Sequence, residues 1–253
     1  MVRGNMVDKP DIEKFAALVR EADSIAVLTG AGISTPSGIP DFRSASGIYS
    51  NEKNQNVFDI RVFQSNPEFF YQFARDFYPQ VAEAEPNAAH KTLAAWEERG
   101  MNVRIATQNI DDLHERGGSP EVIHMHGQIL RALCAECGHQ WGWAGAMELD
   151  DLCHSCGTVG TVRPDVVWFG EMPYHMETIM VRAGDCDLFV AIGTSGSVYP
   201  AAGFVTEARH RGVRTLEINL EPSENAHDFD DRLLGPASET VPVWVAGLLK
   251  GGR

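Results

Sequence analysis

The sequence predicts an α/β protein in which a parallel sheet carries a second, smaller domain as an insertion. Three observations predict this class: apolar strand-like runs alternate with helical patterns, glycine or polar residues follow the strands, and two cysteine pairs interrupt the alternation. The chain has 253 residues, which is enough for one large domain or for one domain with an insert.

Short apolar runs predict the strands of the sheet. They are residues 24–30, 103–107, 187–193 and 214–220. Helical spacing of apolar residues predicts helices at 88–99 and 201–211, and also at 12–22, where Asp11 can cap the first turn. Parallel sheets bind ligands at the carboxyl ends of their strands. The polar and glycine-rich residues that follow these runs therefore predict a binding crevice.

Two segments do not follow the alternation. Residues 44–85 are rich in aromatic side chains with helical spacing, and residues 128–163 contain the cysteine pairs. We expect these two segments to form the small domain, as a helical insert and a zinc-ribbon insert. Residues 8–43, 86–127 and 164–250 are then expected to form the sheet domain.

The composition argues against several kinds of partner. A formal net charge of −14 opposes binding to a phosphate backbone, so no direct nucleic-acid partner is expected. No apolar run reaches the roughly 18 residues of a membrane helix. No apolar signal core follows either possible start, Met1 or Met6. We expect a cytoplasmic protein that does not bind a membrane.

The cysteines predict a metal site. Cys134 and Cys137 form one C-x-x-C pair, Cys153 and Cys156 form a second, and Cys186 stands alone. The two pairs are separated by fifteen residues, which is the spacing of a zinc site. Four thiolates leave no open position for a substrate, so one structural Zn²⁺ is expected. A redox dithiol is the less favoured alternative.

Three other motifs leave alternatives open. The turn at 30–32 suits a phosphate, but a tight turn without a ligand explains it about as well. Residues 107–114 offer amides and a carboxylate for a ribose and a carboxamide, or for the N-cap of a helix. His124 and His126 supply a candidate general base or two structural side chains. We expect at most one of the two to enter a given site.

Taken in order, these motifs resemble the sirtuin family of NAD-dependent protein-lysine deacylases. The resemblance extends from about Ser24 to about Leu249. Its motifs are residues 30–34, 38–43, 107–111 and 126–127, the two cysteine pairs, and residues 163–164, 167–171, 193–195, 198–202 and 219–221. The resemblance implies a Rossmann-like parallel sheet with an inserted small domain of helices and a zinc ribbon.

The resemblance implies that NAD is bound by residues of these motifs. The implied contacts are Gly30, Ala31, Gly32, Ser34, Ile39, Asp41, Phe42, Arg43, Gln108, Asn109, Ile110, Asp111, Gly193, Thr194, Ser195, Asn219, Leu220, Glu221 and Ala237. By the same resemblance, residues 41–43 lie on a loop that closes over the cofactor, and Ala237 lies near the adenine.

The resemblance also implies the reaction. His126, which immediately precedes Gly127, takes the place of the general base, with Asn109 and Asp111 as further catalytic residues. The acyl group of a protein lysine passes to ADP-ribose, and nicotinamide is released. The implied substrate-binding residues are Val167, Trp168, Phe169, Gly170, Glu171 and Val198, with the peptide lying as a strand along 167–171. We expect a monomer that acts on acyl-lysine proteins. An NAD hydrolase or mono-ADP-ribosyltransferase on the same fold is the alternative.

The acyl preference depends on one predicted helix. Sirtuins that remove succinyl or malonyl groups resemble each other in a Tyr-x-x-Arg pair that binds the acyl carboxylate. An ungapped alignment from Pro67 places Ala74 and Phe77 there, while Tyr71 and Arg75 have the wrong spacing. The C-terminal half nevertheless resembles a bacterial branch whose members can carry both activities. We expect acetyl and other neutral acyl groups to be preferred, with Phe77 lining an apolar pocket.

Overall fold

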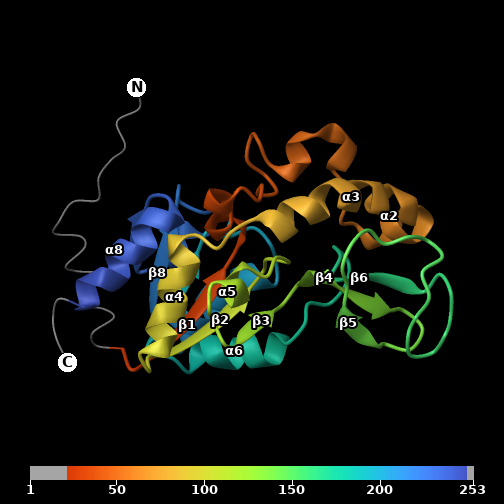
Figure 1. The fold of residues 1–253 in the computed structure, drawn as a ribbon. Helices are drawn as coiled ribbons and strands as arrows, with labels where there is room; N and C mark the ends of the chain where they lie inside the picture. The colour runs from red at the N-terminus through yellow and green to blue at the C-terminus, as the bar shows by residue number, and fades with distance from the viewer. Residues whose placement is uncertain (1–21, 250–253) are drawn as a thin grey trace.

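A computed structural model of the chain describes residues 22–249. The helix predicted at 12–22 lies outside the described residues, apart from Ala22, which is buried in the core. Within this range, six parallel strands form the main sheet in the order β3-β2-β1-β7-β8-β9 (Figure 1). Their bounds are β1 Ser24–Thr29, β2 Asn102–Thr107, β3 Val122–His124, β7 Leu188–Ile192, β8 Arg214–Asn219 and β9 Asp231–Leu234.

The strand order reverses beside β1. Strands β2 and β3 lie on one side of β1, and β7, β8 and β9 lie on the other. The register aligns Thr29 with both Thr107 and Ile192, so the carboxyl ends of the three central strands meet at one edge. Such a switch point is where parallel α/β sheets bind ligands. The parallel sheet expected from the sequence is therefore confirmed, with its crevice edge at residues that follow β1, β2 and β7.

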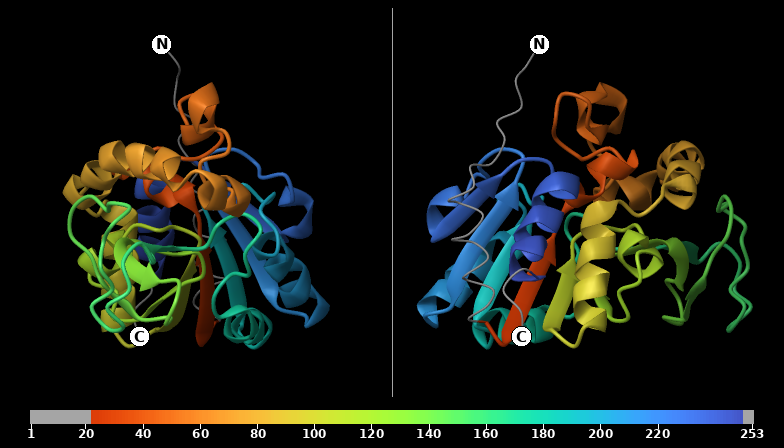
Figure 2. Two further views of the ribbon diagram at one scale, coloured as in Figure 1. Left: turned by 90° about the vertical axis from the view of Figure 1, so that its right-hand side faces the viewer. Right: turned by 60° about the vertical axis from the view of Figure 1, so that its left-hand side comes forward.

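Helices cover both faces of this sheet (Figure 2). Val27 of β1 packs with Trp96 and Trp244 on one face, whereas Leu28 packs with Phe204 on the other. Successive strand residues point to opposite faces, which explains this division. The helices are α4 Ala88–Glu98 and α8 Ala237–Leu249 on the first face, α6 Met176–Gly184 and α7 Phe204–His210 on the second, and the short α5 Leu113–Arg116 after β2.

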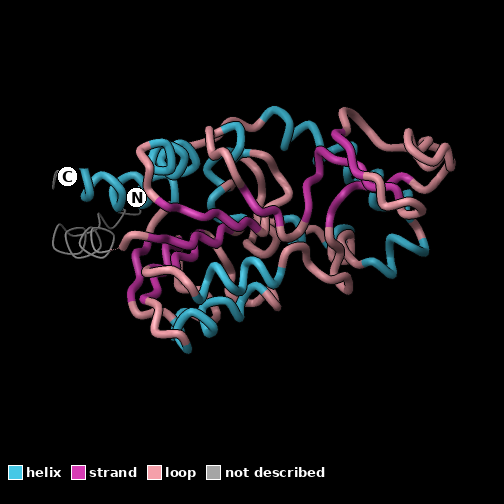
Figure 3. Tube along the Cα trace, turned by 90° about the horizontal axis from the view of Figure 1, so that it is seen from below, coloured by secondary structure: helices cyan, strands magenta, loops and turns pink. Residues whose placement is uncertain are grey.

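A second sheet and two helices form a smaller lobe beyond the edge of the main sheet (Figures 1 and 3). A three-stranded antiparallel sheet has the order β5-β4-β6, with β4 Gly127–Cys134, β5 Gln140–Gly142 and β6 Val162–Val166. Two helices, α2 Ile60–Ser65 and α3 Pro67–Glu83, pack beside it around a cluster of aromatic rings. Single 3-10 turns are η1 Ala31–Ile33, η2 Thr35–Ser37, η3 Ile48–Ser50, η4 Glu52–Asn54, η5 Ala201–Gly203 and η6 Ala226–Asp228.

The helices of the described range are all too short or too polar to cross a bilayer.

Candidate active site

A cleft of about 770 Å³ opens at the carboxyl edge of the main sheet, toward the small domain. Pockets that bind small molecules and cofactors typically measure about 300–1,000 Å³. The walls combine the segments after β1, β2, β7 and β8 with a loop of the helical insert and the segment after β6. The volume and the position at a switch point both fit a dinucleotide.

Glycines allow two loops to touch at the floor of this cleft. A Cβ on Gly30 would lie 2.7 Å from the Gly193 carbonyl oxygen, and one on Gly32 would lie 2.7 Å from the Gly193 Cα. The Gly32 N–H donates to the Gly193 oxygen over 2.9 Å. The segment after Gly30 forms two 3-10 turns instead of a longer helix, so its N–H groups are not a helix N-terminus of the usual kind.

Asn109 is fixed by neighbours from two strands. Its Nδ2 donates to the Gly30 carbonyl oxygen at 3.2 Å and to Ser34 Oγ at 3.0 Å, and Ser34 Oγ donates to Asp111 Oδ2 at 2.9 Å. Burial raises the pKa of Asp111, while hydrogen bonds from the Leu113 N–H and Ser34 oppose that rise. Asp111 therefore holds the first turn of α5, as the N-cap alternative expects, and also orients Ser34 behind Asn109.

His126 has the geometry of a general base. Its Nδ1 lies 3.0 Å from the Gln108 carbonyl oxygen, which can only accept a hydrogen bond. Nδ1 must therefore carry the proton, and Nε2 is left with a lone pair. Burial lowers the pKa of His126, and the bond to Gln108 partly opposes this. The side chain lines the cleft, whereas His124 is not among the lining residues.

Most of the predicted site residues meet in this cleft. Those that line it are Gly30, Ala31, Gly32, Asp41, Phe42, Arg43, Gln108, Asn109, Ile110, His126, Val167, Trp168, Phe169, Gly170, Glu171, Gly193, Thr194, Ser195, Val198, Asn219, Leu220, Glu221 and Ala237. Three predicted residues do not line it. Ser34 and Asp111 lie one layer behind Asn109, and Ile39 is 6% exposed in the core of the small domain.

Several other lining residues were not among the predicted contacts. They are Thr35, Pro36, Ser44, Ala45, Tyr49, Phe58, Val166, Pro173, Tyr199, Pro222, Ser223, Glu224 and Pro236. Ala45, Tyr49 and Phe58 come from the helical insert, where aromatic spacing indicates burial but not which rings face a ligand. Thr35, Pro222 and Pro236 directly extend predicted motifs and could have been found by widening them.

The segment 167–171 uses much of its main chain within the protein. The Val167 N–H donates to the His126 oxygen at 2.8 Å, and the Phe169 N–H donates to the Phe58 oxygen at 2.8 Å. The Trp168 N–H donates to a carboxylate oxygen of Glu171, which also pairs with both terminal nitrogens of Arg163. A peptide strand bound here would have to pair with the other main-chain groups of this segment.

The prediction for Phe77 is wrong. Neither Ala74 nor Phe77 lines the cleft, and Phe77 is 4% exposed, with its ring stacked on Phe73 at 5.2 Å between centroids. The aromatic core of the small domain holds this face of α3, so another segment forms the cleft wall. Arg75 is bound by Glu68 at 3.1 Å and Glu148 at 2.8 Å, outside the cleft lining.

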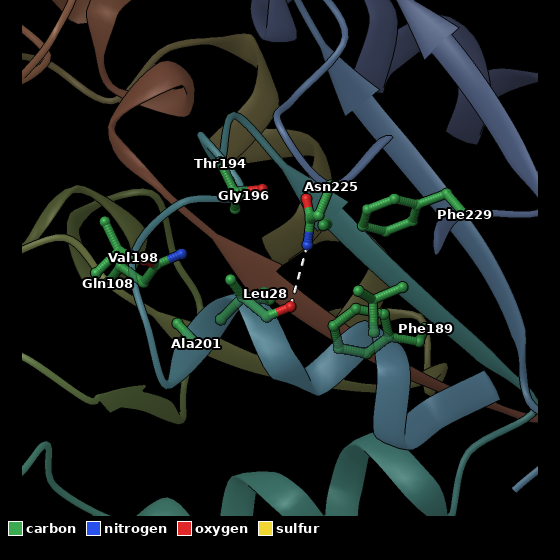
Figure 4. Close-up of a pocket in the computed structure, with 12 residues that line it drawn as sticks. Leu28, Gln108, Phe189, Thr194, Gly196, Val198, Ala201, Asn225 and Phe229 are labelled. Atoms are coloured by element: carbon green, nitrogen blue, oxygen red, sulfur yellow. Dashed lines mark hydrogen bonds between the residues drawn. The ribbon is translucent and has the colours of Figure 1, made fainter. Parts of the chain in front are cut away.

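A second, very small cavity lies behind the cleft (Figure 4). It measures about 10 Å³, close to the size of one water molecule. Gln108, Thr194 and Val198 border both spaces, and Asn225 closes the cavity by donating from Nδ2 to the Ala202 oxygen at 3.0 Å. It is a packing gap behind the cleft wall and too small for a ligand.

The four paired cysteines form a separate cluster in the small domain. Their sulfur atoms all lie within 4.8 Å of one another, with 3.8 Å between Cys134 and Cys156 and 3.7 Å between Cys137 and Cys153. A tetrahedral zinc ion with bonds of about 2.3 Å places its sulfur ligands about 3.8 Å apart. The cluster therefore fits structural zinc. None of the four lines the cleft, and Cys186 is not part of the cluster.

A Rossmann-like sheet with a cleft at its switch point, a half-buried histidine in that cleft and a four-cysteine ribbon define a dinucleotide-binding protein with a structural metal. Residues 30–200 match the Sir2 family. The chain is 45% identical over 242 residues to an NAD-dependent protein deacylase of Escherichia coli strain K12, covering 94% of this chain and 87% of that protein. It is 47% identical over 233 residues to an NAD-dependent protein deacylase of Caulobacter vibrioides, covering 89% of this chain and 96% of that protein.

Solved structures agree with these sequence matches. A mutant Sir2 homologue in complex with ADP-ribose has a TM-score of 0.87 and 32% identity, covering 97% of this chain and 98% of that chain. A Sir2 protein bound to an acetylated peptide has a TM-score of 0.82 and 32% identity, covering 95% and 98%. The chain belongs to the Sir2 family.

Proposed function

We propose that this protein is an NAD-dependent protein-lysine deacylase that transfers the acyl group to ADP-ribose and releases nicotinamide. The observation that carries the proposal is His126, a half-buried histidine with a free Nε2 in a dinucleotide-sized cleft. The names of its relatives support the same activity. NAD supplies the leaving nicotinamide and the ribose that accepts the acyl group.

The residues of the cleft have two tasks: some bind NAD, and one accepts a proton. Gly30, Gly32 and Gly193 let the loops after β1 and β7 touch, and their backbone lines the cleft where the phosphates would lie. Asn109, fixed by Ser34, presents an amide group to the cleft. His126 accepts a proton from a ribose hydroxyl through Nε2 and so activates that hydroxyl for attack on the acyl carbon.

Neutral acyl groups are the proposed substrates. Among the described residues that line the cleft, Arg43 is the only Lys or Arg, and it is bound by Ser197 and lies 3.7 Å from Glu224. The walls contributed by the helical insert, Tyr49 and Phe58, are aromatic. Burying an unpaired carboxylate there would cost several kcal/mol, so acetyl and other uncharged groups are favoured.

Mass spectrometry of the products formed from NAD and an acetyl-lysine peptide tests the proposal. We expect nicotinamide, free lysine peptide and O-acetyl-ADP-ribose. None of these products should form unless NAD and the acetyl-lysine peptide are both present. Free ADP-ribose without the peptide would indicate an NAD hydrolase, and ADP-ribosylated protein would indicate a transferase.

The domain boundaries, the cytoplasmic location and the monomeric state are further predictions, separate from this proposal.

A further inference from the structure

Groups from other segments hold each carbonyl of the loop that follows β2. The Gln108 oxygen lies 3.0 Å from His126 Nδ1, the Asn109 oxygen lies 3.2 Å from His124 Nδ1, and the Ile129 N–H donates to the Ile110 oxygen over 2.8 Å. His124, the last residue of β3, and His126, in the turn that follows, thus bind neighbouring carbonyls. The main chain of Asn109 lies between the carbonyl bound by the proposed general base and the carbonyl bound by His124.

The ring of His124 faces an acceptor at each nitrogen. Nδ1 faces the Asn109 carbonyl oxygen, and Nε2 lies 2.6 Å from Glu115 Oε1. A carbonyl and a carboxylate only accept, whereas a neutral imidazole has a single N–H. Both contacts are satisfied together when the ring carries two protons and a positive charge. The His124 side chain is 8% exposed, whereas its partner Glu115 is 36% exposed.

Carboxyl groups surround this ring. Besides Glu115, Asp111 and Asp112 face His124: burial raises the pKa of both carboxyls, and a protonated His124 opposes that rise. His114 also lies nearby, but burial lowers its pKa well below the usual range, so it stays neutral. His124 therefore has three carboxyl groups around it and no charged histidine beside it on α5.

We propose that His124, as an imidazolium paired with Glu115, is a positioning residue that fixes Asn109 for NAD. The Asn109 N–H donates to Thr107 Oγ1 at 3.0 Å, so the His124 contact fixes the other end of the same residue. A ring without a donor at Nδ1 leaves the Asn109 carbonyl without this contact, and NAD affinity then falls.

Two amide substitutions separate the contacts of this ring. In His124→Asn the amide nitrogen replaces Nδ1 and retains a donor to Asn109. In His124→Gln the amide nitrogen replaces Nε2 and retains only the contact to Glu115. We expect His124→Asn to bind NAD as the wild type does. We expect His124→Gln to bind NAD roughly tenfold more weakly.

Glu115→Gln replaces the second partner of the ring with a neutral side chain of similar size, and NAD should then bind more weakly than in the wild type. His210→Ala, an exposed histidine at the end of α7, is the matched control and should behave as wild type. Calorimetric Kd values for NAD and thermal unfolding should be measured for all variants between pH 6 and 9.

Nitrogen NMR of labelled histidine gives a readout that does not depend on activity. Two protonated ring nitrogens on His124 at neutral pH are expected. Equal NAD affinity in His124→Asn and His124→Gln, or a ring with a single N–H, would overturn the proposal. This inference rests on the proposed function for the role of Asn109. If the wild type fails to bind NAD, the proposed function and this positioning role are both overturned. If the wild type binds NAD and the two variants bind it with equal affinity, the positioning role alone is overturned.

Discussion

Burial acts on His126 in the direction that a general base requires. Because burial lowers its pKa, the neutral ring persists at a pH below the ordinary histidine value of about 6.5. The base form is the active one, so kcat/KM should be constant at neutral pH and fall only as the pH drops through the lowered pKa. An acid limb at or above pH ~6.5 in the kcat/KM profile would contradict this assignment.

Removal of the His126 ring tests the same role directly. His126→Ala should lower kcat by a factor on the order of 10²–10⁴, the usual contribution of a general base. The Kd for NAD should change little, which separates this residue from His124. His210→Ala serves again as the control, and unchanged kcat in His126→Ala would show that another group takes the proton.

Individual side chains mark the limit of what the sequence predicts about the site. Motif position found His126 and Asn109, and the structure brings both to the cleft. Motif position could not show that Ser34 and Asp111 lie behind Asn109, because that arrangement depends on how the segments after β1 and β2 pack. Phe77 was misplaced for a similar reason, since apolar spacing on α3 shows that a face is buried but not what covers it.

At the scale of elements, the zinc ribbon is stabilised mainly by its four cysteine side chains. Its strand β5 has three residues, and the loop 143–161 contains few buried apolar groups. A segment of this kind gains its folding free energy from the metal. Cys153→Ser should therefore lose the zinc, lower the thermal unfolding temperature and abolish deacylation, although the cleft lies elsewhere.

Cys186→Ser is the matched control, because Cys186 lies outside the cluster. It should keep one zinc per chain and full activity. Zinc content measured by mass spectrometry of metals, together with thermal unfolding, separates the two variants. A Cys153→Ser protein with wild-type zinc content and stability would refute a structural role for the metal.

Long, strongly apolar elements were predictable, and short ones were not. The strands β1, β2, β7 and β8 are apolar runs of five or six residues, and all four match the sequence expectation closely. The edge strands β3 and β9 have three and four residues, too few to show a period. Their pairing follows from the strands beside them rather than from their own sequence.

The assembled cleft depends on both domains. The sheet supplies the floor and His126, whereas the loop 41–49 and Phe58 supply a wall. Arg43 of that loop contacts Ser197 and Glu224, so the loop is tied across the cleft to segments that follow β7 and β8. The acyl preference is a property of this combined wall, and no single motif encodes it.

Acetyl-lysine peptides should be processed with much higher kcat/KM than succinyl-lysine peptides of the same sequence. A succinyl carboxylate would enter a wall that offers the Tyr49 hydroxyl but no free guanidinium, and burial raises the pKa of Tyr49 to about 12, so the phenol stays neutral. Loss of a charge-assisted bidentate contact leaves the carboxylate without a partner.

Tyr49→Arg should shift the ratio of kcat/KM values toward succinyl, because it places a guanidinium in the cleft wall. Phe77→Arg is the matched control: it adds the same group to the aromatic core, where it should destabilise the fold by several kcal/mol and leave the ratio unchanged. Both peptides should be compared at saturating NAD, with thermal unfolding of each variant. Similar wild-type kcat/KM values for the two acyl groups would show that the cleft holds a carboxylate by other means.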